Sequence, residues 1–119
     1  MYEYSASLLA VVDGDTVDVT VDLGFRIHRE IRLRLADIDT HETYGVPKES
    51  EEYRKGKVES EFVEAWFEAG ETDEFDWPFV VRTEKKGKFG RYLAVVERRT
   101  DGAILNDDLI AEFGEEIRY

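Results

Sequence analysis

The chain contains no cysteine, and only two of its 119 residues are histidines. The lack of cysteine excludes disulfide bonds, thiolate zinc sites and a cysteine nucleophile. No apolar run approaches the length of a membrane-spanning helix, and the first residues lack the basic segment and apolar stretch of a secretion signal. We therefore expect a cytoplasmic protein away from membranes, in which any metal is held by oxygen ligands.

Basic residues are also scarce. The chain has 16 Lys and Arg against 28 Asp and Glu, which gives a formal net charge of −12. This balance repels nucleic acid at long range and by itself argues against a nuclease. Two interpretations of the acidity stay open. A salt-adapted protein works where screening lengths are only about 3 Å, whereas many ordinary cytoplasmic proteins are acidic for solubility.

The length and the apolar content of 42% suit one domain over residues 1–119, which we expect to be a monomer. Apolar and polar residues alternate with a period of two over residues 16–23 and 31–36, as in half-buried strands. Helical spacing of apolar residues extends over 48–69, and we expect Gly56 to interrupt or weaken that helix. The remaining predicted elements are strands at 6–12, 79–83 and 92–97 and a short helix at 105–113.

The order of these elements predicts the fold. Three strands joined by tight turns suggest a meander, and a helix then separates them from two further strands and a last helix. This order matches a mainly β (α+β) fold, a five-stranded OB-type Greek-key β-barrel with a helix inserted between strands 3 and 4.

Four acidic residues form the first candidate site: Asp13, Asp15, Asp39 and Glu42. Hard divalent cations such as Ca²⁺ prefer several oxygen ligands, and clustered carboxylates raise the affinity for them. A turn and a strand end could bring the four together. Taken separately, each fragment is also explained as an ordinary turn or an ordinary strand end.

Arg34 and Arg91 form the second candidate site, because planar guanidinium groups can hold the negative charge of a phosphodiester transition state. A lone strand arginine, such as Arg32 beside it, is as well explained as a solvated partner of a carboxylate. In an unbroken strand Arg34 and Asp39 would face opposite sides, so the strand must end or bulge between them.

The clearest basic segment is 85–91, in which four bases surround one aromatic residue and two glycines. This composition suits contact with phosphates and stacking on bases, which makes Lys85, Lys86, Lys88 and Phe89 candidate substrate-binding residues. The alternative is a solvated hairpin tip with glycine turn residues.

Three motifs in this order resemble those of the staphylococcal nuclease (thermonuclease) family: VDGDTV at 12–17, RLADIDTHE at 34–42 and KFGRYLA at 88–94. The resemblance covers almost the whole chain, and it implies a Ca²⁺-dependent nuclease that cleaves DNA or RNA to 3'-phosphate and 5'-hydroxyl ends. It places Ca²⁺ ligands at Asp15, Asp39 and the Thr40 carbonyl, with Asp13 nearby. It also assigns phosphate binding to Arg34 and Arg91 and general-base catalysis to Glu42.

The chain departs from the family pattern at His41, where a proline is usual, and at Phe89, where a tyrosine is usual. His41 is interpreted either as a bystander in a mobile loop or as a second proton carrier or phosphate contact. The alternative function is a catalytically inactive module that binds nucleic acid or protein, because OB-type barrels are reused for recognition. The nuclease interpretation predicts a single-stranded or unpaired nucleic acid as the substrate.

Overall fold

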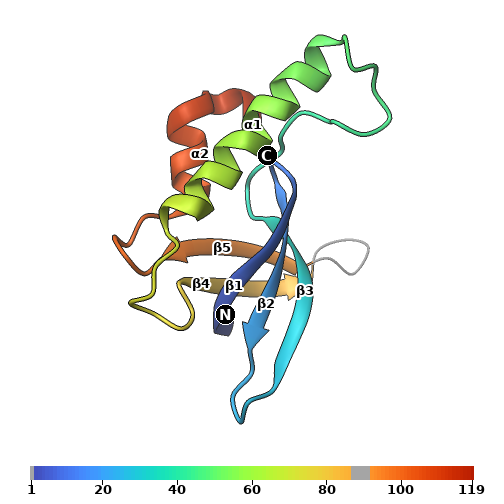
Figure 1. The fold of residues 1–119 in the computed structure, drawn as a ribbon. Coiled ribbons are helices and arrows are strands. Elements are labelled where there is room, and N and C mark those ends of the chain that lie inside the picture. The colour runs from blue at the N-terminus through green and yellow to red at the C-terminus, as the bar shows by residue number, and fades with distance from the viewer. Residues whose placement is uncertain (1, 87–91) are drawn as a thin grey trace.

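The computed structural model describes residues 2–86 and 92–119, with the side chains of 84–86 left aside. Five strands form one body, and two helices pack together at one end of it (Figure 1). The elements in chain order are β1 (Tyr2–Asp13), β2 (Thr16–Asp22), β3 (His28–Leu35), α1 (Glu51–Ala69), β4 (Phe79–Lys86), β5 (Tyr92–Arg98), α2 (Leu105–Phe113) and a 3-10 helix, η2 (Gly114–Ile117).

The five strands close into a barrel in the order β1-β2-β3-β5-β4. Neighbouring strands run antiparallel except β3 and β5, which are parallel, and β4 closes the barrel by pairing with β1. The predicted meander, the helix between strands 3 and 4 and the OB-type barrel are therefore confirmed.

The alternation read from the sequence defines the inside of the barrel. Val17, Val19 and Val21 of β2 are buried, and so are Leu33 and Leu35 of β3, while the residues between them are more exposed. Because successive side chains of a strand point to opposite faces, the residues between them, including Arg34, are directed away from the core.

Helix α1 supplies the aromatic part of the core. Phe67 packs edge-on against Phe79 of β4, with ring centroids 4.8 Å apart, and Trp66 stacks on the same ring at 6.0 Å. The Trp66 indole also donates a 2.8 Å hydrogen bond to Asp108 of α2. Burying an aromatic side chain of this size contributes about 2–3 kcal/mol, so these contacts fix α1 on the barrel.

Helix α1 begins three residues later than expected, and Gly56 does not interrupt it. Ser50 caps the helix by accepting a 3.1 Å hydrogen bond from the Tyr53 backbone N–H, which sets the start at Glu51. Gly56 lies inside the continuous helix because a neighbouring loop occupies the space of a side chain, 2.6 Å from the His41 carbonyl oxygen. The predicted interruption there was wrong.

Strands β1 and β4 are longer than predicted. β1 begins at Tyr2 because it pairs with β4 over Tyr2 to Ala6 before it pairs with β2, and β4 continues to Lys86. A strand with two partners gains ladder hydrogen bonds that local alternation does not reveal. Among the described residues, no helix has both the length and the apolar character needed to cross a membrane.

Candidate functional site

The β1–β2 turn and the end of β3 meet at one point on the barrel. Thr16 at the start of β2 pairs with Arg34, and the Leu35 N–H donates a 2.8 Å hydrogen bond to the Asp15 carbonyl. The chain then leaves β3 through Asp37, whose φ of 63° is a left-handed conformation that Asp tolerates better than most residues. The strand therefore ends between Arg34 and Asp39, as expected.

Asp15 is the buried acid of the site, with 7% of its surface exposed. One carboxylate oxygen accepts a 2.9 Å hydrogen bond from the Thr16 hydroxyl, and the other accepts a 3.1 Å bond from the Thr40 N–H. The second oxygen also lies 3.4 Å from Arg34 Nη2. A buried carboxylate with these partners is fixed in position rather than free to rotate.

Arg34 joins the two acidic segments. Its Nη2 lies 3.1 Å from Asp39 Oδ1 and 3.2 Å from the Ile38 carbonyl oxygen, in addition to its contact with Asp15. Every hydrogen bond of this guanidinium to a described residue uses Nη2, so Nη1 and Nε remain as donors. Asp39 itself is exposed over 55% of its side chain.

Residues at the C-terminal end hold the loop that carries Asp39. The Asp39 N–H donates a 2.8 Å hydrogen bond to the Ile117 carbonyl, and the Tyr119 N–H donates a 3.0 Å bond to the Asp37 carbonyl. Ile38 and Arg118 form a bridge between these two bonds. The sequence gives no sign that the C-terminal residues hold this loop, because backbone pairing between distant segments does not depend on residue type.

Asn106 braces the same region from α2. Its amide nitrogen donates to the Ala36 and Ala94 carbonyls at 2.9 and 3.1 Å, and its oxygen accepts a 3.2 Å bond from the Val96 N–H. Asn106 thus ties the exit of β3 to β5.

Asp13 shows that negative charge accumulates at the site. The pKa of Asp13 is raised from 3.8 to about 6, first by burial, then by the nearby Asp15 carboxylate, with a smaller repulsion from Glu42. Hydrogen bonds from the Gly14 N–H and the Thr40 hydroxyl oppose this shift. A carboxyl group that resists ionisation beside other carboxylates is in a place where a cation would be stabilised.

Glu42 lies on the exposed side of the loop, two residues beyond Thr40. Its backbone N–H donates a 2.6 Å hydrogen bond to a carboxylate oxygen of Glu52 in the first turn of α1. The backbone of Glu42 is therefore held by α1, while its carboxylate is exposed to solvent close enough to Asp13 to affect its pKa.

His41 contacts two glutamates, Glu59 of α1 and Glu116 of η2. Its backbone N–H and its Nδ1 each lie 2.8 Å from one of the two Glu59 carboxylate oxygens, and its Nε2 lies 3.2 Å from Glu116. Burial lowers the pKa of His41, but Glu59, Glu52 and Glu116 together outweigh it, so the net shift is upward. Glu59 is 3% exposed, and the sequence analysis did not distinguish it from the other glutamates of α1.

Two glycines allow the loop to approach the rest of the protein. A Cβ at Gly14 would lie 2.7 Å from Thr40 Cγ2, and one at Gly56 would lie 2.6 Å from the His41 oxygen. Both distances are shorter than real Cβ contacts allow, so glycine is required where the β1–β2 turn and α1 contact the loop.

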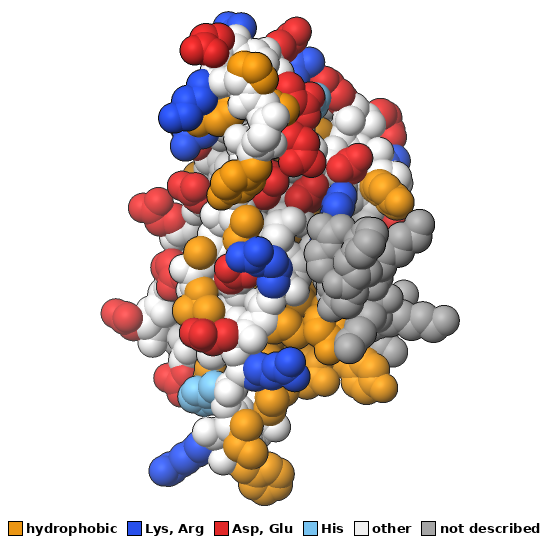
Figure 2. Space-filling view, turned by 90° about the vertical axis from the view of Figure 1, so that its right-hand side faces the viewer, with side chains coloured by type: hydrophobic (Ala, Val, Ile, Leu, Met, Phe, Trp, Pro, Cys, Tyr) orange, Lys and Arg blue, Asp and Glu red, His pale blue; other side chains and the backbone are white. Residues whose placement is uncertain are grey.

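The predicted basic segment lies mostly outside the described residues. Lys85 and Lys86 fall within β4, although only their backbone is described, and Lys88, Phe89 and Arg91 lie outside the described part of the chain. The predicted pairing of Arg34 with Arg91 therefore stays a prediction. Figure 2 shows acidic side chains gathered in the half of this face nearer the helices, whereas hydrophobic ones are frequent in the half nearer the β2–β3 end.

The donors at the site can be compared with what a hard cation requires. Within residues 2–86 and 92–119, no three histidine or carboxylate side chains are grouped so as to hold a metal ion. The predicted set is smaller, with two carboxylates and one backbone carbonyl, and it leaves other coordination positions to water. Asp15 and Asp39 both lie within 3.4 Å of one Arg34 nitrogen. The donor chemistry suits Ca²⁺ with water completing the shell.

Comparison with known proteins adds no relative: no protein-family model matches the chain, and a search of curated proteins also gave no match.

Proposed function

We propose that the protein is a Ca²⁺-dependent phosphodiesterase that hydrolyses DNA or RNA, with 3'-phosphate and 5'-hydroxyl products. One observation carries the proposal: Arg34 contacts both Asp15 and Asp39, which come from separate segments of the chain. These are residues that the three nuclease-like motifs assign to phosphate binding and to the metal. The product ends rest on the resemblance alone.

The carboxylates of Asp15 and Asp39 and the carbonyl of Thr40 would hold the cation. Bound there, Ca²⁺ supplies positive charge that polarises a phosphoryl oxygen. Asp15 is preorganised for this role by its bonds from the Thr16 hydroxyl and the Thr40 N–H, whereas the exposed Asp39 side chain can adjust. A fixed ligand beside an adjustable one suits the flexible coordination of Ca²⁺.

Arg34 would bind the phosphate that is cleaved. Its Nη2 is occupied by Asp39 and the Ile38 carbonyl, which orients the guanidinium, and Nη1 and Nε are the remaining donors. From these nitrogens the guanidinium can donate to a phosphate oxygen and stabilise the charge that develops on it. Arg91, outside the described residues, would supply the second guanidinium.

Glu42 would act as the general base. Its exposed carboxylate accepts a proton from a water molecule as that water attacks phosphorus, and the bond from phosphorus to the 5' oxygen breaks. The departing oxygen takes its proton from solvent. The bond from the Glu42 N–H to Glu52 fixes the backbone from which this carboxylate extends.

Cleavage of a fluorescent single-stranded oligonucleotide in Ca²⁺ or in EDTA tests the proposal, at low and at high salt. We expect Ca²⁺-dependent cleavage that Glu42→Gln lowers at least a hundredfold, because general-base catalysis typically contributes about 10²–10⁴-fold. Glu49→Gln is the matched control, since it removes the same charge from an exposed position near the start of α1. Equal, small losses in both variants would contradict the role of Glu42.

The same assay tests the alternative of an inactive binding module. If the folded wild-type protein binds the oligonucleotide equally well in Ca²⁺ and in EDTA and cleaves it under neither condition, the barrel is a recognition domain. Oligonucleotide binding measured by anisotropy beside the cleavage assay separates these outcomes.

A further inference from the structure

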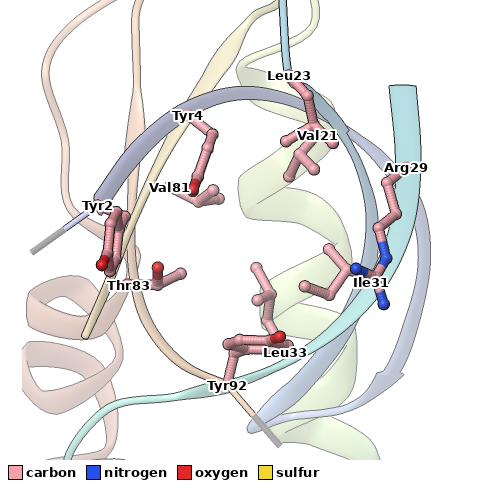
Figure 3. Close-up of a pocket in the computed structure, with 10 residues that line it drawn as sticks. All are labelled: Tyr2, Tyr4, Val21, Leu23, Arg29, Ile31, Leu33, Val81, Thr83 and Tyr92. Carbon is pink, nitrogen blue, oxygen red and sulfur yellow. The ribbon is translucent and has the colours of Figure 1, made fainter. Parts of the chain in front are cut away.

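A cavity of about 340 Å³ opens into the barrel at the end away from α1 (Figure 3). Residues of all five strands line it, from Tyr2 in β1 to Tyr92 in β5, and they surround it as a ring. Small barrels are normally filled by their own side chains. A hollow of this size is comparable to the small-molecule sites found in the mouths of β-barrels.

The chemistry of the lining is selective. Tyr2, Tyr4 and Tyr92 lie around one part of the ring, and aliphatic side chains form much of the remainder. Among the lining residues that the structure describes, Arg29 is the only charged one and none is a carboxylate, although the chain has 28 acidic residues. Arg29 forms no ion pair with any described residue. Aromatic rings beside a guanidinium that has no ion-pair partner among the described residues suit a planar aromatic group that carries negative charge nearby.

The surroundings of the cavity point to the same kind of ligand. Lys86 pairs with Tyr92 through the backbone, which places the end of β4 and its two lysine positions next to the lining. Leu23, Phe25 and Ile27 of the β2–β3 connection are all more than 40% exposed. The opening is thus bordered by exposed apolar side chains of the β2–β3 connection and by the backbone at the end of β4.

The cavity is distinct from the site at Arg34 but is linked to it along β3. Leu33 lines the cavity, and the next residue, Arg34, points out of the barrel toward Asp15 and Asp39. Arg29 precedes Arg34 by five strand positions, which is about 17 Å at the rise of a β-strand. A ligand that reaches both places must therefore be longer than a mononucleotide.

We propose that this cavity binds an unpaired base of a single-stranded nucleic acid, with Arg29 contacting an adjacent phosphate, while Arg34 holds the phosphate to be cleaved. The inference rests on the proposed nuclease function. It locates a base-binding site for the single-stranded substrate that the nuclease interpretation predicts, because a base can enter the cavity only when it is neither paired nor stacked in a duplex. Tyr4 and Tyr92 supply the aromatic surface for the base.

The test is binding in EDTA, which separates recognition from cleavage. A fluorescein-labelled octathymidylate is titrated with the full chain and compared with a DNA hairpin of equal phosphate number and with thymidine monophosphate. We expect the single strand to bind at least tenfold more tightly than either probe. Tyr4→Leu should weaken its binding about 5- to 100-fold, because stacking of a base on an aromatic side chain contributes strongly to such complexes.

Arg29→Gln should reduce the salt dependence of binding, lowering the slope of log K against log salt by about 0.7 for one lost phosphate contact. Arg32→Gln is the matched control. Arg32 lies on the same strand, but it is directed away from the cavity and paired with Asp18. Its loss should leave the single-strand preference unchanged.

Unchanged affinity in both Tyr4→Leu and Arg29→Gln, or equal binding of single strand and hairpin, would overturn the inference. Binding of thymidine monophosphate as tight as that of the octamer would also overturn it. If a variant fails to fold, the wild-type protein is titrated with the oligonucleotide and the NMR shifts of its tyrosine rings are followed. The inference requires the signals of Tyr4 and Tyr92 to shift. Ca²⁺-dependent cleavage with no response of these rings would refute the cavity site and leave the nuclease proposal intact. A response of these rings without Ca²⁺-dependent cleavage would refute the nuclease proposal alone.

Discussion

Replacing Gly56 by alanine sets two effects of opposite sign against each other. In an isolated helix the change stabilises by about 1 kcal/mol, because glycine has the greater backbone freedom in the unfolded chain. In this protein the new Cβ would lie 2.6 Å from the His41 oxygen and 2.8 Å from Thr43 Cγ2. The first of these contacts is with backbone, so a side-chain rotation cannot relieve it.

The clash should outweigh the gain. Inserting a methyl group into a packed contact costs about 1–3 kcal/mol, which leaves a net loss on the order of 1 kcal/mol. For a domain of this size, such a loss lowers Tm by about 4 °C. The His41 backbone must move away from α1, and its N–H bond to Glu59 is then strained. Since Thr40 and Glu42 flank His41, Ca²⁺ affinity should fall as well.

Thermal unfolding with and without Ca²⁺ measures both effects. Val58→Ala is the control on the same helix, because Val58 is 57% exposed and alanine there should stabilise slightly. We expect Tm to fall in Gly56→Ala and Ca²⁺ to raise it less than in the wild type. A Gly56→Ala protein that is more stable than the wild type, with full Ca²⁺ stabilisation, would refute the loop contact.

Three further predictions concern charge. Because the pKa of Asp13 is raised from 3.8 to about 6, the folded protein holds an extra proton between these values and loses stability as pH rises through them. Asp13→Asn should therefore be more stable in EDTA at pH 7 by on the order of 1 kcal/mol, after discounting for solvent screening, as chemical unfolding can show. The pKa of His41 is raised, so its pairing with Glu59 stabilises below the unfolded value of 6.5 and is lost as pH rises through the folded value. Glu59→Gln should lower this pKa in an NMR titration and reduce that loss; an unchanged pKa would contradict the pairing. If the net charge of −12 reflects adaptation to salt, Tm should rise between about 0.15 and 1 M KCl, where the screening length falls from about 8 to 3 Å, and a flat profile would support the solubility interpretation.

The parts of the fold that sequence predicts well are those with local causes. The valines of β2 alternate with polar residues because one face of the strand is buried, and that pattern is readable within seven residues. The short helix α2 was placed correctly for the same reason. The added length of β1 arises from pairing with β4 almost eighty residues away, and no local pattern records that partner.

In the candidate site, too, the features with local causes were predicted and those that depend on distant contacts were not. Residue type pointed to Asp15 and Asp39 as members of an acidic site and to Arg34 as a phosphate contact, and the structure brings these three together. Glu59 could not be distinguished by sequence, because one buried glutamate among the many glutamates of α1 looks like its exposed neighbours. The role of Ile117 depends on a backbone carbonyl, which every residue type supplies.

The groups that hold the loop in place are not the groups that would bind the cation, so the loop should keep its position when the metal is removed. Asp39 and His41 are held through their backbone N–H groups by the Ile117 carbonyl and by Glu59, neither of which is a proposed Ca²⁺ ligand. Loss of the cation leaves these bonds intact while the carboxylates repel one another. Amide NMR spectra in Ca²⁺ and in EDTA should therefore differ at Asp15 and Asp39 but show the same slow hydrogen exchange at the Asp39 and His41 N–H groups. Fast exchange of both amides in EDTA would mean that the cation, and not the surrounding fold, organises the loop.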